Sequence, residues 1–172
     1  MKIADALLLA FDAEIEMTRS YFEAFPEDKA GWKPHEKSGT LGEIAKHVAL
    51  LPGFGTFFLE NDFMEVKGPP PAAVFVSKAD LFATLDAAVA KFRATLATAS
   101  DDSLTQQWSF TKDGKAFSTA PRASMIKLLF LHHLIHHRAQ LGVYLRLLNV
   151  PVPGIYGPSA DAAWNPEKLG LA

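Results

Sequence analysis

Four of the six histidines lie between Pro121 and Pro151: His132, His133, His136 and His137. The stretch has no internal proline and reads as one long helix. At about 100° per residue, His133 and His137 fall on the same face, one turn apart. Imidazoles at this spacing can bind one metal ion through nitrogen, as zinc sites do. The alternative is a pair of hydrogen-bonded core or interface histidines.

The face that carries His133 and His137 is otherwise apolar. Its other members are Ile126, Phe130, Leu141, Tyr144 and Leu148. An unsatisfied polar group on a buried face costs about 1–3 kcal/mol, which favours a partner for the two imidazoles. His132 and His136 form a second pair, rotated about 100° from this stripe. Lys127, Arg138 and Arg146 are expected on the opposite side.

A third inward-facing histidine, His47, lies on an earlier helix. That helix begins at Thr40 and Glu43, which form a capping box. Its apolar face comprises Leu41, Ile44, Val48, Leu51 and Phe58. Pro52 predicts a kink or break one turn beyond His47. If the two helices are neighbours, His47, His133 and His137 face the same volume, and three protein ligands with an open position are typical of catalytic zinc sites.

The elements that must position these histidines are four amphipathic helices, near residues 3–25, 40–59, 78–99 and 122–148. They predict an all-α protein, a four-helix bundle formed by one domain, residues 1–172. The connection between the second and third helices includes a Pro-rich loop, residues 67–73, and is long enough for a crossover. A short hairpin around Asp113 and Gly114 is expected between the third and fourth helices.

Several polar and aromatic residues outside the stripes have expected positions. Glu14 lies on the apolar stripe of the first helix, and a carboxylate that reaches solvent is favoured over one that approaches the core. His35 lies in a polar loop and is expected to be solvated. Trp32 and Pro34 are expected to pack over one end of the bundle. The Pro- and Gly-rich tail after residue 149 is expected to fold back onto the bundle.

Composition excludes several classes of protein. The 172 residues contain 49% hydrophobic and 21% charged residues with a net charge of −2, which is ordinary for a soluble globular protein. Neither nucleic acid nor a membrane is an expected partner, because no basic block and no long apolar span occurs. The absence of cysteine leaves His, Asp and Glu as metal ligands, and the cytoplasm is the default location.

Three segments together resemble the DinB (damage-inducible) superfamily: Leu41 to His47, His133 to Leu141 with its His-Arg-x-Gln pattern, and the tail from Pro151 to Asp161. One departure is Ala139, where many members carry glycine. The resemblance implies a four-helix bundle, a divalent metal ion, usually zinc or nickel, bound by His47, His133 and His137, and a homodimer. It carries no implication of DNA binding.

Two functions follow from the pattern and the resemblance. The first is a metal-dependent enzyme acting on a small-molecule substrate, either a thiol S-transferase that uses a metal-bound low-molecular-weight thiolate or a hydrolase that uses metal-bound water. The second is a non-enzymatic metal-binding protein of a stress response or of ligand binding. Tyr156 is expected near the pocket of the metal, and Gln140 is either a residue that orients a ligand imidazole or a polar residue at the rim.

Overall fold

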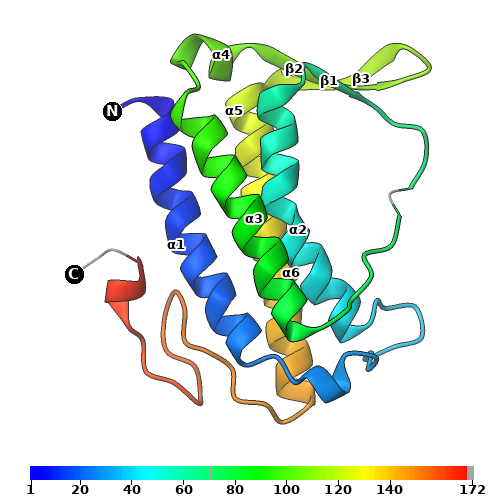
Figure 1. Ribbon diagram of the computed structural model, residues 1–172, viewed down its shortest axis with the longest axis vertical. Coiled ribbons are helices and arrows are strands. Elements are labelled where there is room, and N and C mark those ends of the chain that lie inside the picture. The colour runs from blue at the N-terminus through cyan, green and yellow to red at the C-terminus, as the bar shows by residue number, and fades with distance from the viewer. Residues whose placement is uncertain (70, 170–172) are drawn as a thin grey trace.

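The computed structural model describes residues 1–69 and 71–169 and contains four long helical segments (Figure 1). The first three are α1 (Ile3–Glu23), α2 (Leu41–Glu60) and α3 (Lys78–Ala97). The fourth is a continuous run of α5 (Arg122–Met125), a π-helical segment η2 (Ile126–Leu131) and α6 (His132–Leu147). The predicted four-helix bundle is therefore confirmed, with helix bounds within a few residues of those expected.

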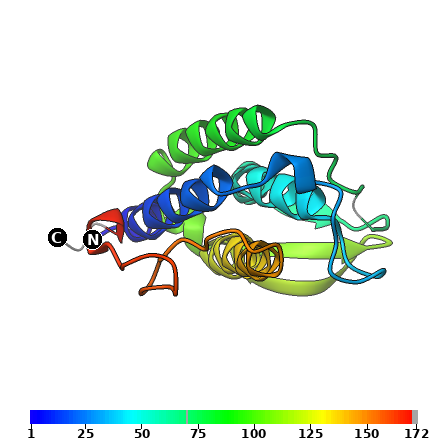
Figure 2. The ribbon, with the colours of Figure 1, turned by 90° about the horizontal axis from the view of Figure 1, so that it is seen from below.

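The order of the helices brings the two histidine-bearing segments together. α2 packs against both α3 and α6, and α1 packs against the same two helices, so α3 and α6 lie on opposite sides of the bundle (Figure 2). α2 and α3 run in the same direction, joined by a long crossover along the outside of the bundle (Figure 1). Pro70, within the predicted Pro-rich loop, lies outside the described residues.

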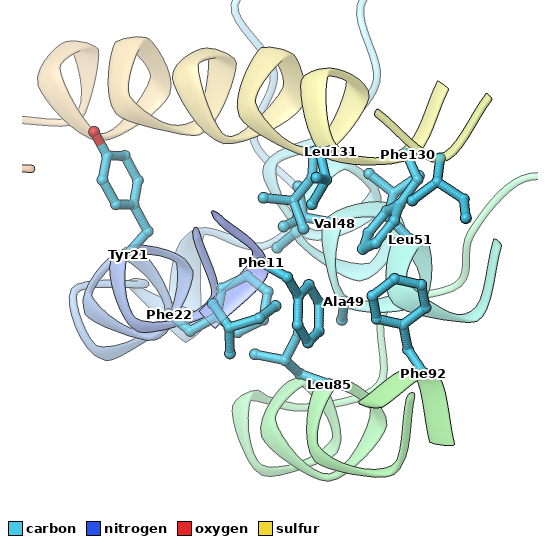
Figure 3. Close-up of a cluster of buried hydrophobic side chains, with 14 of the residues drawn as sticks. Phe11, Tyr21, Phe22, Val48, Ala49, Leu51, Leu85, Phe92, Phe130 and Leu131 are labelled. Carbon is cyan, nitrogen blue, oxygen red and sulfur yellow. The ribbon is translucent and has the colours of Figure 1, made fainter. Parts of the chain in front are cut away.

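Aromatic rings fill the centre of the bundle (Figure 3). Phe92 of α3 lies with its ring centroid 4.7 Å from that of Phe11 and 5.0 Å from that of Phe130. Gly55 of α2 faces this cluster, and a Cβ atom there would approach the Phe130 ring to 2.5 Å. The glycine therefore allows α2 and the fourth helical segment to approach closely, two turns of α2 beyond His47.

A small sheet covers one end of the bundle (Figure 1). The predicted hairpin consists of β2 (Gln107–Lys112) and β3 (Lys115–Pro121). Asp113 and Gly114 have φ values of 51° and 71°, as a type I′ turn requires. β1 (Phe63–Glu65) pairs in parallel with β2 and was not predicted, and neither was the short helix α4 (Asp101–Thr105).

The caps and breaks expected of the helices are mostly present. Thr40 and Glu43 form the capping box of α2. Of the kink or break expected at Pro52, the break is absent: α2 continues through Pro52 to Glu60. Trp32 packs edge-to-face on Tyr144, whereas Pro34, expected to pack beside it, is exposed.

The C-terminal tail returns along the bundle, as predicted. Val152 and Ile155 pack against the core, and Pro166–Leu169 forms a short 3-10 helix, η3. Residues 170–172, part of the expected 1–172 domain, lie outside the described residues. Within the described part of the chain, no helix has both the length and the apolar character needed to cross a membrane.

Two expectations about charged residues are wrong. Arg138 was expected on the outer face but is only 1% exposed, and Glu14, expected to reach solvent, is 8% exposed. α1 and α6 pack together, and across this contact the two charged side chains neutralise each other. The expected basic stripe therefore keeps only Lys127 and Arg146 at the surface.

Candidate metal centre

The three sequence-predicted ligands meet between α2 and α6. The Nε2 atom of His133 lies 3.4 Å from Nε2 of His47 and 2.8 Å from Nε2 of His137. One nitrogen from each ring lies within 4.8 Å of the others, and all three residues are half-buried. His132, His136 and His35 are exposed, as expected. We call His47, His133 and His137 the histidine triad.

Hydrogen bonds to neighbouring groups fix which nitrogens carry protons. The ring of His133 donates to the backbone of Leu129, within the π-helical segment. Nδ1 of His137 lies 2.7 Å from Oε1 of Gln140, which can only accept. A neutral imidazole has a single N–H. Because that N–H is used outside the triad in both rings, each directs an unprotonated nitrogen inward.

The electrostatics of the triad favour neutral rings. Burial, together with the neighbouring His137 and His133, lowers the pKa of His47 to about 4. Burial also lowers the pKa values of His133 and His137, and the hydrogen bonds to Leu129 and Gln140 oppose this only in part. At neutral pH the triad is therefore a set of unprotonated nitrogen donors, the form that binds metals.

These distances fit a metal ion. Two nitrogens bound to one tetrahedral ion at about 2.05 Å are separated by about 3.3 Å. The separation of His47 and His133 matches this, and that of His133 and His137 is tighter. Lone pairs this close repel one another unless a cation lies between them. The triad could thus hold a metal ion, and in the described part of the chain no carboxylate joins it.

A second polar cluster lies between α6 and α1 and was not predicted. Nη2 of Arg138 lies 2.6 Å from Oε2 of Glu14 and 2.9 Å from the hydroxyl of Tyr156, which donates to Oε1 of Glu14 at 2.6 Å. We call Glu14, Arg138 and Tyr156 the ion cluster. Tyr156 was expected near the pocket of the metal, but it does not approach the triad. It lines a hollow of about 450 Å³ beside Arg138 and Gly142. The signal available in the sequence was the charged residue Glu14 on the apolar stripe of the first helix.

Comparisons with known proteins agree with this architecture. The model of the DinB superfamily matches residues 10–141. The uncharacterized protein YrdA of Bacillus subtilis (strain 168) is 27% identical over 170 residues, covering 97% of this chain and 94% of the relative. A DinB-like protein from Bacillus cereus ATCC 10987 has a similar structure, with a TM-score of 0.67, 21% identity, and 88% of this chain and 97% of that chain covered.

Two further solved structures share the fold. A DinB-like protein of Bacillus subtilis, YjoA, superimposes with a TM-score of 0.60 at 18% identity, covering 83% of this chain and 92% of its own. A DinB-family protein of Exiguobacterium sibiricum 255-15 gives a TM-score of 0.59 at 18% identity, covering 87% and 93%. The family match spans most of the chain, including all three triad histidines, and the chain belongs to the DinB superfamily.

Proposed function

We propose that this protein is a metal-dependent enzyme in which His47, His133 and His137 hold one divalent ion, zinc or nickel, and that it transfers a low-molecular-weight thiol to a small electrophile. The observation that carries the proposal is the convergence of three imidazole nitrogens at a half-buried site. Imidazole nitrogen suits zinc and nickel. Three protein ligands leave room for a substrate in a tetrahedral site.

The ion would supply activation of the nucleophile, since a bound divalent cation lowers the pKa of a water or thiol that it ligates. The protein's own residues hold the three donors unprotonated and directed inward. The chain has no cysteine, so an attacking thiol must enter as a cosubstrate.

The surroundings of the triad favour thiol transfer over hydrolysis. Hydrolysis of an ester or amide needs a group that moves protons to the leaving atom. Within the described residues, no carboxylate belongs to the triad's cluster. Glu43 lies one turn before His47, but its carboxylate accepts from the Thr40 backbone in the capping box. A thiol, with an ordinary pKa of about 8.5, loses its proton without such help.

The test is turnover by protein loaded with zinc or nickel. A panel of low-molecular-weight thiols is offered with a chromogenic electrophile, and a panel of esters and amides is offered without thiol. We expect metal-dependent turnover in the first panel. His133→Ala should abolish it, and His132→Ala is the matched control on the same helix.

Each other outcome has a defined meaning. Turnover only of esters or amides would replace transfer by hydrolysis. Metal binding without turnover in either panel would support the alternative of a non-enzymatic metal-binding protein. Protein that takes up neither metal would reject the proposal altogether.

We also propose that the protein forms a homodimer. Three large apolar side chains of the fourth helical segment, Leu128, Val143 and Leu147, are each more than half exposed, on a segment that also exposes His132 and His136. Sedimentation at micromolar concentration should give twice the monomer mass. Val143→Glu should shift the measured mass toward that of the monomer. A monomeric wild-type protein would contradict the proposal.

A further inference from the structure

The side chain of Gln140 bridges two histidines of α6. Its Oε1 atom lies 2.7 Å from Nδ1 of His137, and its Nε2 atom lies 3.3 Å from Nε2 of the exposed His136. We propose that Gln140 is a positioning residue that holds His137 in the tautomer able to bind metal, and that His136 fixes the orientation of the Gln140 amide. The proposal rests on the metal-binding function proposed above.

The contact with Gln140 selects one of the two neutral forms of His137. An amide oxygen can only accept, so the bond requires the proton of His137 to be on Nδ1. The Nε2 atom, which lies 2.8 Å from Nε2 of His133, then has a free lone pair. The competing tautomer, with a proton on Nε2, would have to lose that proton before it could bind a metal. Gln140 therefore prepares the ligand before any metal arrives.

The amide of Gln140 has two orientations, and only one supports this tautomer. Rotation by 180° would place the NH₂ group against Nδ1 of His137 and stabilise the non-binding form. In the observed orientation the NH₂ group lies 3.3 Å from Nε2 of His136. His136 opposes the rotation when this Nε2 carries no proton, because it then accepts from the NH₂ group. If the amide rotated, two acceptors would face each other at this contact. An exposed histidine that lies outside the triad therefore acts on the triad through Gln140.

The helical spacing explains why these residues can form the chain of contacts. Gln140 follows His137 by three residues and His136 by four, so all three share one side of α6. His132, the remaining exposed histidine of α6, lies one turn before His136 and is eight residues from Gln140. It is a matched control, because its substitution removes an exposed imidazole from the same helix without touching the amide.

The first test reads the tautomer directly in metal-free protein. Long-range ¹⁵N–¹H correlation of the imidazole rings should place the proton of His137 on Nδ1 in the wild type. In Gln140→Leu the Nε2-protonated form should become populated. Because this measurement needs no metal, it decides the positioning role even if zinc does not bind. A wild-type His137 protonated on Nε2 would overturn the proposal.

The second test reads zinc affinity by competition with a chromophoric chelator. Gln140→Leu should weaken zinc binding by about 10–100-fold, the usual effect of losing a group that orients a metal ligand. Gln140→Glu keeps an oxygen acceptor for Nδ1 and should restore most of the affinity. Equal affinity of Gln140→Leu and the wild type would count against the role, and circular dichroism of each variant checks folding.

The role of His136 is tested in two backgrounds. His136→Ala should weaken zinc binding at least about twofold when Gln140 is present, in line with coupling between residues in contact. In the Gln140→Leu background it should have no effect, since leucine can neither donate to nor accept from His136. His132→Ala should leave the zinc affinity unchanged in both backgrounds. An effect of His136→Ala of the same size in both backgrounds would mean that it does not act through Gln140.

Discussion

The two polar clusters that include residues of α6 differ in how their polar side chains are satisfied. Arg138 of the ion cluster donates to the backbone oxygen of Glu14 at 2.8 Å and to its carboxylate at 2.6 Å. It is almost fully buried, and its charge is compensated within the chain. His137, the preceding residue, belongs to a triad whose members direct like lone pairs at one another and remain half-buried.

The difference separates a structural cluster from a binding cluster. A buried cation and anion joined by hydrogen bonds compensate each other's charge and need no bound ligand or ion. Three unprotonated nitrogens cannot satisfy one another, so their arrangement is complementary to a cation that the chain does not supply. Of the ion cluster's buried side-chain nitrogens and oxygens, only Nε of Arg138 has no partner among the described residues. Substitutions in the two clusters should therefore have different consequences.

The largest effect is expected from Arg138→Met. It leaves the Glu14 carboxylate buried without its cation, and breaking such a pair costs about 3–5 kcal/mol. Urea unfolding of metal-free protein at neutral pH measures the loss. His133→Ala, measured in the same way, should cost clearly less, because it removes a neutral ring with its hydrogen bond to Leu129 and leaves no buried charge unpaired.

A double substitution sharpens this prediction. Glu14→Leu combined with Arg138→Met removes both charges, and replacing a buried pair by apolar side chains is often close to neutral. Most of the lost stability should therefore return. If the double variant is no more stable than Arg138→Met alone, the cost comes from packing and not from an unpaired charge.

Metal removal should have the next largest effect, and only through the triad. A ligand at 1,000 times its Kd stabilises by about 4 kcal/mol, a rise in Tm of roughly 8–16 °C for a domain of this size. Calorimetry with and without zinc measures the shift. It should vanish in His133→Ala and persist in the variant with both Glu14→Leu and Arg138→Met. A shift lost in that variant would mean that the clusters are not independent.

Much of the triad could be predicted from the sequence, because it depends on angles around one helix at a time. The spacing of His133 and His137 gives their common face, and the capping box at Thr40 gives the start of α2 and hence the direction of His47. The Asp113 and Gly114 pair similarly gives the hairpin turn. These features are local, and local geometry follows from residue type.

The ion cluster could not be predicted in this way. The angle of Arg138 around α6 places it beside His137, at the boundary of the apolar face, and leaves open whether another helix covers it. Burial was decided by Glu14, 124 positions away in the sequence, and by Tyr156 in an irregular tail. The π-helical segment Ile126–Leu131 has no proline or glycine to mark it. β1 is only three residues long and depends on its pairing with β2.

A third prediction concerns pH and again separates the clusters. The pKa of His47 in the folded, metal-free protein is about 4, below its ordinary value of about 6.5. The unfolded chain therefore binds protons that the folded chain does not. The stability this contributes is fully present above pH 6.5 and is lost as the pH falls from 6.5 through 4. The half-buried position of the ring makes this loss smaller than that caused by metal removal.

The measurement is urea unfolding of metal-free protein across pH 4–7. In His47→Ala the stability should depend less steeply on pH in this window. The ion cluster contains no histidine, so Tyr156→Phe should leave the slope unchanged. A wild-type slope that survives His47→Ala would assign the pH dependence to other groups.

The smallest effect is expected from Tyr156→Phe. Burial, and after it the hydrogen bond to Glu14, raises the pKa of Tyr156 to about 12, so at neutral pH the hydroxyl is protonated and donates to Oε1 of Glu14. Because the residue is half exposed, water can replace part of this bond, and the loss should be roughly 1 kcal/mol. Arg138 keeps its contacts with Glu14, so the ion pair survives. Amide exchange over residues 152–162 should become faster, while that of α6 should not.

The control is Tyr156→Phe in the variant with Glu14→Leu and Arg138→Met. There it should lower the free energy of unfolding only slightly, since the partners of the hydroxyl are gone. An undiminished loss of stability would show that Tyr156 stabilises the tail through its ring and not through the ion cluster.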